Sequence, residues 1–136
     1  MTDSLPEAAT VATEPPPQVM ATLAALRLIE RLQGKHGELL FYQSGGCCEG
    51  TAPMCFPVGE FLVGGRDVLL GRIGGAEYWI GAQHFEYSRH TQLIIDAVEG
   101  RGTMFSLDEG EGQHFRMRLR LFDDDEYAAL QAAGKV

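Results

Sequence analysis

Apolar residues follow a helical spacing near the N-terminus and a strand spacing near the C-terminus. Between Thr22 and Gln33 they form one face, which predicts an amphipathic helix with Thr22 as its N-cap. The apolar members of this face are Ala25, Leu28, Ile29 and Leu32. From His114 to Leu121, apolar and polar residues alternate, which predicts a strand with one buried face. Its polar face carries Arg116, Arg118 and Arg120, which we expect to be solvated and paired with nearby acidic residues. The alternative is that these arginines bind an acidic partner or an anionic ligand.

The middle of the chain consists of short apolar segments separated by glycine pairs. We predict strands over residues 38–43, 56–63, 67–73, 77–80 and 92–98, with hairpin turns at Gly64-Gly65 and Gly74-Gly75. Residues 83–90 suit either a helical turn or an irregular strand. A final helix is predicted from Asp124 to Ala133, capped by Asp123. These elements predict an α+β domain, in which an N-terminal amphipathic helix and a C-terminal helix pack on an antiparallel, two-layer β-sheet.

The first residues differ in composition from the rest of the chain. Three consecutive prolines end at Pro17 without apolar periodicity before them, so we predict a flexible N-terminal tail over residues 1–18 and a single domain over residues 19–136. The net charge of −8 argues against binding to nucleic acid or to an anionic membrane surface. No apolar run is long enough to span a bilayer, and the acidic start is unlike a secretory signal, so we expect a cytoplasmic protein.

The cysteine loop, Ser44 to Pro57, has the sequence SGGCCEGTAPMCFP and carries the strongest chemical signal. Its glycines and prolines predict a long loop rather than a helix or strand. It contains all three cysteines, Cys47, Cys48 and Cys55, and an odd number favours free thiols or thiolate ligands over a structural disulfide. Thiolates bind zinc or iron, and nearby backbone amides lower the pKa of a thiol. Metal binding, thiol redox chemistry and burial as structural cysteines all remain open.

His84, Glu86 and His90 form a second candidate group. On an extended chain their even separations place all three side chains on one face, whereas on a helix His84 and His90 diverge. Two histidines and a carboxylate can complete a metal site whose sulfur ligands come from the cysteine loop. The alternative is that both histidines are partly buried and hydrogen-bonded. Mixed Cys and His ligation favours zinc, or non-haem iron where a coordination position stays open.

Four segments of the chain resemble a small bacterial family catalogued as domain of unknown function seven-seven-nine: SGGCCEGTAPMCFPVGEF, DVLLG, FEYSRHTQLIIDAVEGRG and FSL. The resemblance covers roughly Val19 to Phe122, and the double-cysteine loop makes it specific. Genes of that family often lie beside an aldehyde dehydrogenase gene. The resemblance therefore implies an accessory role in aldehyde or alcohol metabolism, with an aldehyde dehydrogenase as partner.

The chain is also faintly similar to A-type iron–sulfur carrier proteins. Those carriers place an amphipathic helix before a strand and a Gly-Gly-Cys loop, and here Gly45-Gly46-Cys47, Ile95-Asp96 and residues 102–107 fall in the same order. The carriers end in a paired-cysteine tail, whereas this chain ends in a predicted helix without cysteine. The similarity implies a compact β-rich fold with one leading helix, but two of the ligands expected for cluster transfer are missing.

These observations lead to hypotheses from different functional classes. The first is a metal-binding or thiol-redox accessory protein that serves an aldehyde dehydrogenase. The second is a small metalloenzyme acting on a small carbonyl or thiol substrate, which needs an open metal position and a lined pocket. The third is a structural interaction module with inert, buried cysteines. We favour the accessory protein over an enzyme and expect a homodimer, because small domains with sheet edges often pair them.

Overall fold

A computed structural model of the chain describes residues 15–43, 53–59, 63–65, 67–100, 106–108 and 110–136; the side chains of His84 and Tyr87 are not described. Within these ranges the elements are, in order, β1 (Val19–Ala21), α2 (Leu23–His36), β2 (Leu39–Gln43), β3 (Met54–Pro57), β4 (Val68–Ile73), β5 (Ala76–Ile80), α3 (Ala82–Ser88), β6 (Thr91–Glu99), β7 (Gln113–Leu121) and α4 (Asp124–Ala132). None of the helices in these ranges is long and apolar enough to cross a bilayer.

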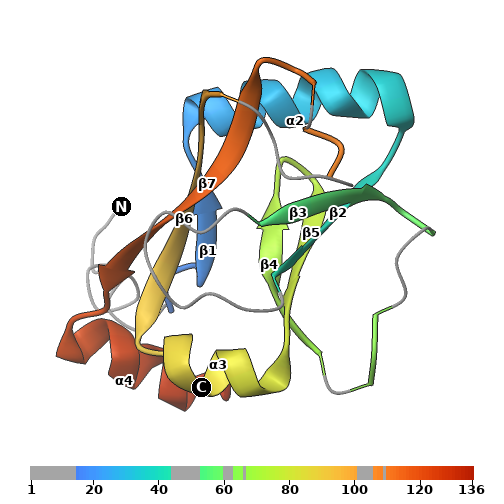
Figure 1. Cartoon of the computed structure of the whole chain (residues 1–136). Coiled ribbons are helices and arrows are strands. Elements are labelled where there is room, and N and C mark those ends of the chain that lie inside the picture. Colours follow the sequence, from blue (N-terminus) through green and yellow to red (C-terminus); the bar gives the residue numbers. More distant parts are fainter. Residues whose placement is uncertain (1–14, 44–52, 60–62, 66, 101–105, 109) are drawn as a thin grey trace, which may run out of the picture.

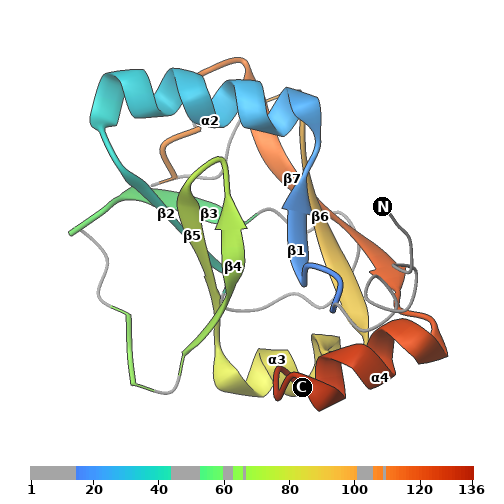
Figure 2. The same cartoon turned by 180° about the vertical axis from the view of Figure 1, so that it is seen from behind.

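The described strands form two sheets that face each other. One sheet has the order β1-β6-β7 and the other β3-β2-β5-β4. Aromatic rings fill the interior: Phe41 of β2 stacks on Tyr78 of β5 at 5.7 Å between centroids and meets Phe115 of β7 edge to face at 4.9 Å. α2 lies across one end of the sheets, while α3 and α4 lie at the opposite end (Figures 1 and 2). The predicted α+β class is confirmed.

The strand pairing is mixed, which corrects the predicted antiparallel sheet. Three pairs are antiparallel, namely β2 with β3, β4 with β5 and β6 with β7. Two pairs are parallel, namely β1 with β6 and β2 with β5. The prediction rested on glycine turns, which determine only how consecutive strands pair. Strands separated by long connections can also pair in parallel, and tertiary packing makes that choice.

One of the two predicted glycine hairpins forms. Gly74 and Gly75 have φ angles of +56° and +84° and connect β4 to the antiparallel β5, and positive φ at both positions suits a tight hairpin turn. The chain also turns at Gly64, whose carbonyl accepts a hydrogen bond from the Asp67 amide at 3.1 Å. However, β3 and β4 lie at opposite edges of their sheet, so the predicted hairpin at Gly64-Gly65 is wrong. The parallel pair of β2 and β5 lies between them.

α2 is the predicted N-terminal helix, and it continues to His36. Thr22 caps its start as predicted, because its hydroxyl accepts a hydrogen bond from the Ala25 amide at 3.2 Å. The helix continues beyond the predicted end at Gln33, so Gly34 lies inside it and Gly37, with φ of +82°, follows its last turn. A glycine inside a helix lowers the helix stability by about 1 kcal/mol relative to alanine. This loss is smaller than the about 1.5–3 kcal/mol that burying one leucine side chain contributes, so the packing of the apolar face outweighs it. The buried face is the predicted one: Ala25, Leu28, Ile29 and Leu32.

The predicted C-terminal strand and helix are both confirmed. β7 alternates over most of its length between positions that are more buried and positions that are more exposed. α4 begins after Asp123, whose side chain accepts a hydrogen bond from the Glu126 amide, and Glu126 completes the predicted capping box. The polar face of β7 meets acidic residues as expected, since Arg118 lies 3.5 Å from Asp96.

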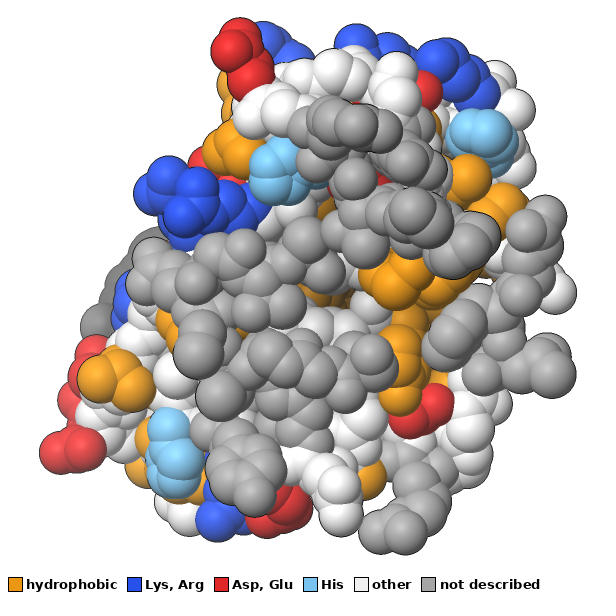
Figure 3. Space-filling view, in the orientation of Figure 1, with side chains coloured by type: hydrophobic (Ala, Val, Ile, Leu, Met, Phe, Trp, Pro, Cys, Tyr) orange, Lys and Arg blue, Asp and Glu red, His pale blue; other side chains and the backbone are white. Residues whose placement is uncertain are grey.

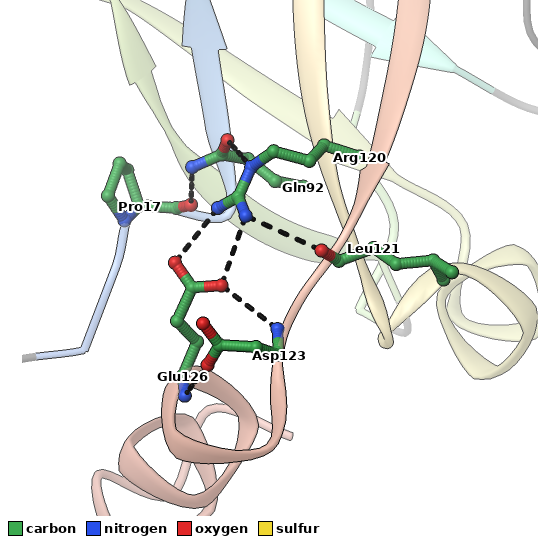
Figure 4. Close-up of polar contacts among 6 residues, drawn as sticks. All are labelled: Pro17, Gln92, Arg120, Leu121, Asp123 and Glu126. Atoms are coloured by element: carbon green, nitrogen blue, oxygen red, sulfur yellow. Dashed lines mark hydrogen bonds and ion pairs between the residues drawn. The ribbon is translucent and has the colours of Figure 1, made fainter.

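Arg120 connects β7, α4 and the start of the described chain (Figure 4). Its guanidinium donates to both carboxylate oxygens of Glu126, at 3.1 and 2.9 Å, and to Oε1 of Gln92 at 3.1 Å. Nε2 of Gln92 donates in turn to the Pro17 carbonyl oxygen at 2.9 Å. Arg120 therefore links the consecutive elements β7 and α4 to Gln92 of β6 and, through Gln92, to Pro17, which are both distant from it in the sequence.

The residue just before β1, Gln18, is hydrogen-bonded to β6. The Leu93 amide donates to the Gln18 carbonyl at 3.0 Å, and Gln18 is only 8% exposed. Residues 1–14 lie outside the described residues, so the flexible tail stays a prediction for them.

Candidate functional site

The parallel pairing of β2 and β5 brings the last residue before the cysteine loop and the start of α3 to one end of the four-stranded sheet, where these two central strands finish. Gln43, the last residue of β2, pairs with Ile80, the last residue of β5. After Gln43 the chain enters residues 44–52, which contain Cys47 and Cys48 and lie outside the described residues. After Ile80, the Gly81 amide donates to the Gln43 carbonyl at 3.4 Å, and α3 begins at the next residue. Both segments therefore leave the sheet from neighbouring positions.

A tyrosine and a carboxylate anchor the chain at the same end of the sheet. The Tyr42 hydroxyl donates to Oδ1 of Asp67 at 2.8 Å, and the Gly64 amide donates to Oδ2 at 2.6 Å. Burial raises the pKa of Tyr42, and the hydrogen bond to Asp67 and its negative charge raise it further. The tyrosine therefore keeps its proton and holds the residues that lead into β4.

Cys55 belongs to β3, which occupies the last four residues of the predicted loop, and it lies in the protein interior. It pairs with Phe41 and has no exposed surface. Its amide donates to Oγ of Ser106 at 2.9 Å, and its carbonyl accepts from the Leu107 amide at 2.9 Å. Burial raises the pKa of the thiol, and the negative charge of Asp108 raises it further. A thiol in this setting stays protonated and is a poor ligand or nucleophile, because both roles need the thiolate.

A buried carboxylate beside Cys55 was missed by sequence reasoning. Asp108 has no exposed surface; one oxygen accepts from the Ser106 hydroxyl and the other accepts from the Phe115 amide at 3.0 Å. The Cys55 amide, Ser106 and Asp108 thus form a hydrogen-bonded chain that ties β3 to β7. The available signal was weak: serine and aspartate side chains often bind nearby backbone amides, and here both precede a glycine-rich turn.

The second candidate group does not share one face, because residues 82–88 form the helix α3. A helix turns about 100° per residue, so positions 84 and 86 lie on nearly opposite sides of it. Glu86 is exposed and forms an ion pair with Arg89 at 3.6 Å. His90 follows the helix and stacks on Tyr127 of α4, with ring centroids 4.5 Å apart. Of the two conformations left open for residues 83–90, the structure shows the helical one.

In the part of the chain that the structure describes, no group of three or more His, Cys, Asp or Glu side chains could hold a metal ion. The histidine side chains visible in Figure 3 lie well apart from one another. Cys55, Glu86 and His90 are described and do not come together in such a group. Cys47, Cys48 and the side chain of His84 lie outside the described set, so their role as ligands stays a prediction.

Comparison with known proteins identifies the family. The model of a domain of unknown function, DUF779, matches residues 28–121. The chain belongs to this family. A search of curated proteins finds no match to this DUF779 chain. A search of solved structures finds the crystal structure of IscA with the 2Fe-2S cluster, at 24% identity and a TM-score of 0.44, covering 74% of this chain and 83% of that chain. A likeness at this level supports no conclusion about what the DUF779 chain binds.

Proposed function

We propose that this DUF779 chain is a small metal-binding accessory protein that holds zinc or iron with the thiolates of Cys47 and Cys48 and with His84. The observation that supports the proposal is the parallel pairing of β2 with β5, since the cysteine loop and α3 both follow strands that finish at the same end of the sheet. Thiolate sulfur and imidazole nitrogen are ligands that protein zinc and iron sites commonly use.

Chain length allows these residues to approach one another. Cys47 follows Gln43 by four residues, and an extended chain spans about 3.6 Å per residue, so their Cα atoms are within about 14 Å. His84 follows Gly81 by three residues, which is a rise of about 4.5 Å along a helix. Gly81 is itself hydrogen-bonded to Gln43. A metal bound between the two segments is therefore within reach of both.

Three of the predicted ligands are left out of this proposal. The Cys55 thiol is buried and its pKa is raised. Glu86 is paired with a neighbouring arginine, and His90 is stacked on a tyrosine. Each of them would have to give up its present surroundings to reach a metal at this end of the sheet.

Elemental analysis of protein purified without chelator tests the proposal. We expect zinc or iron, and Cys47→Ser and Cys48→Ser should each reduce the metal content because a neutral hydroxyl is a poor ligand for these ions. Cys55→Ala is the matched cysteine control and should keep the metal. His84→Ala should lose metal, with His90→Ala as its control. Metal content that is unchanged in both cysteine-to-serine variants would contradict the proposal.

The behaviour of metal-free protein separates the alternative functions. If the folded protein carries no metal and one thiol reacts rapidly, thiol redox chemistry at Cys47 or Cys48 replaces metal binding. If all three thiols react slowly, the cysteines are structural and the chain is an interaction module. The metal stoichiometry is also informative, because a value near one atom per two chains indicates a site shared in a homodimer.

The finer role that we propose is service to an aldehyde dehydrogenase by a homodimeric form of the protein. Its support is the association implied by the family resemblance, together with the sheet edges that a small domain presents for pairing. Light scattering tests the dimer. Co-purification with the dehydrogenase, followed by activity assays with and without the metal-loaded protein, tests the partner. A dehydrogenase that neither binds the protein nor responds to it would argue against this role.

A further inference from the structure

One side of α2 faces away from both sheets. Leu23, Arg27, Glu30 and Gly34 are exposed there and follow one another at intervals of three or four positions. At about 100° per residue they lie within about 60° of one another, opposite the buried side of the helix. No other described helix or strand covers this side (Figures 1 and 2). These four residues are called the outer face of α2.

The charged residues of the outer face differ from their neighbours on the same helix. Arg31 and Lys35 lie beside this face and both form ion pairs with Glu111, at 3.5 and 2.9 Å. Arg27 and Glu30 form no ion pair with any residue that the structure describes. The charges that are paired within the chain thus lie beside the outer face, and the two on it are available for a contact outside the chain.

The two ends of the outer face differ in size. Leu23 begins the helix with 63% of its surface exposed. At Gly34, an added Cβ would meet no described atom within 4 Å outside its own helix. Glycine is a poor helix former, and neither a positive φ nor a close described neighbour requires it here. A second surface packed on the helix offers a reason, because a glycine leaves space for a large side chain that faces it.

We propose that the outer face of α2 binds the same face of a second copy of this chain, with the two helices antiparallel about a two-fold axis. One register satisfies both features of the face. It places Arg27 opposite the partner's Glu30. The same register places Leu23 opposite the partner's Gly34, because both pairs are centred between positions 28 and 29. A two-fold axis repeats each contact, so the interface contains two ion pairs and two leucines that each pack at a glycine.

A second copy suits this face because the face is neutral and complementary to itself. The chain carries a net charge of −8, so most other surfaces of two copies repel each other. Opposite charges that meet across an interface favour one partner and one register. A single helix pair is smaller than a standard interface of about 1,600 Å², so we expect a dissociation constant in the micromolar range. The inference rests on the homodimer of the proposed function, whose interface it names, and is independent of bound metal.

Charge reversal tests the register, with the dimer dissociation constant of the full-length protein measured by sedimentation equilibrium. Arg27→Glu and Glu30→Arg should each raise this constant at least about 10-fold, because each turns two attractive contacts into two repulsive ones. The double variant Arg27→Glu/Glu30→Arg should return it to within about threefold of the wild-type value, since the exchanged charges are again opposite. Arg116→Glu, the matched control, makes the same charge change at an exposed position of β7 and should leave the constant unchanged.

A second variant tests the close approach at Gly34. Gly34→Gln should raise the melting temperature of dilute, monomeric protein, because glutamine is a better helix former than glycine. It should also raise the dimer dissociation constant at least about 10-fold, because the longer side chain occupies the space that the partner's Leu23 fills. A purely local role for Gly34 would not weaken the dimer. An unchanged dissociation constant would overturn the proposed register.

The outcomes distinguish the interface from the function on which it rests. A dimer that neither charge reversal weakens overturns the inference and leaves the homodimer, with the sheet edges as the surface to test next. Reversals that weaken the dimer without recovery in the double variant overturn the pairing of Arg27 with the partner's Glu30. A wild-type protein that stays monomeric at millimolar concentration overturns both the interface and the homodimer. The metal content of the same samples then still decides the metal-binding proposal.

Discussion

When Cys55 is the last remaining thiol, it should react only as the protein unfolds. The test uses the variant Cys47→Ser/Cys48→Ser, in which the protein retains a single cysteine. Cys55 has no exposed surface, and burial and the charge of Asp108 raise the pKa of its thiol. Its strand is paired with β2 and is also hydrogen-bonded to Ser106 and Leu107. A reagent therefore reaches the sulfur only after this part of the core opens.

The expected protection follows from the free energy of that opening. A small domain of ordinary stability unfolds with at least about 5 kcal/mol, which corresponds to an open fraction of about 2 × 10⁻⁴. When reclosing is fast, the reaction rate scales with this fraction. Cys55 in the native variant should thus react roughly 5,000-fold more slowly than the same thiol in the unfolded chain.

The measurement is the rate of reaction with a chromogenic disulfide reagent at mildly alkaline pH, in buffer and in concentrated urea. Circular dichroism of the same samples shows whether the variant is folded in buffer. A folded variant whose rate lies within about tenfold of the unfolded rate would refute the reasoning. Cys55 would then be accessible and would return to the set of candidate ligands.

Three further changes test the packing around the sheets. Asp108→Ala leaves two buried donors without their acceptor and should lower the free energy of unfolding in urea by about 2–6 kcal/mol, so a loss below about 1 kcal/mol would contradict its role. Gly74→Ala should lower the melting temperature more than Gly75→Ala. Both variants add left-handed backbone strain of about 1–2 kcal/mol, but only the Cβ added at position 74 would lie 3.1 Å from an isoleucine side chain of α2. Equal losses of melting temperature would contradict this contact. Glu126→Gln should lower the urea midpoint at neutral pH, since the hydrogen bond from Arg120 lowers the pKa of Glu126. A carboxylate whose pKa is lowered by folding stabilises the fold above its ordinary pKa of about 4.3, and this stabilisation is lost as the pH falls from there through the lowered pKa. A difference in urea midpoint between the variant and the wild type that persists in acid would count against this ion pair.

Elements that depend on nearby residues could be predicted from the sequence. The Thr22 cap and the Asp123 capping box are hydrogen bonds between residues three positions apart. The hairpin at Gly74-Gly75 requires only two residues that tolerate positive φ. The buried face of α2 and the alternation of β7 follow from the periods of helix and strand. For all of these, the determining interactions or periods lie within one segment of the chain.

The tertiary structure decided how these segments combine. The parallel pairing of β2 with β5 separates β3 from β4 and brings α3 to the start of the cysteine loop, and no local pattern encodes that pairing. Sequence reasoning selected the cysteine loop and residues 84–90, but packing placed Cys55 in the core and His90 against Tyr127. The physical reason is that apolar burial is non-directional. A cysteine between glycines and prolines has the same local sequence whether it is exposed or buried, and the segments that cover it come from elsewhere in the chain.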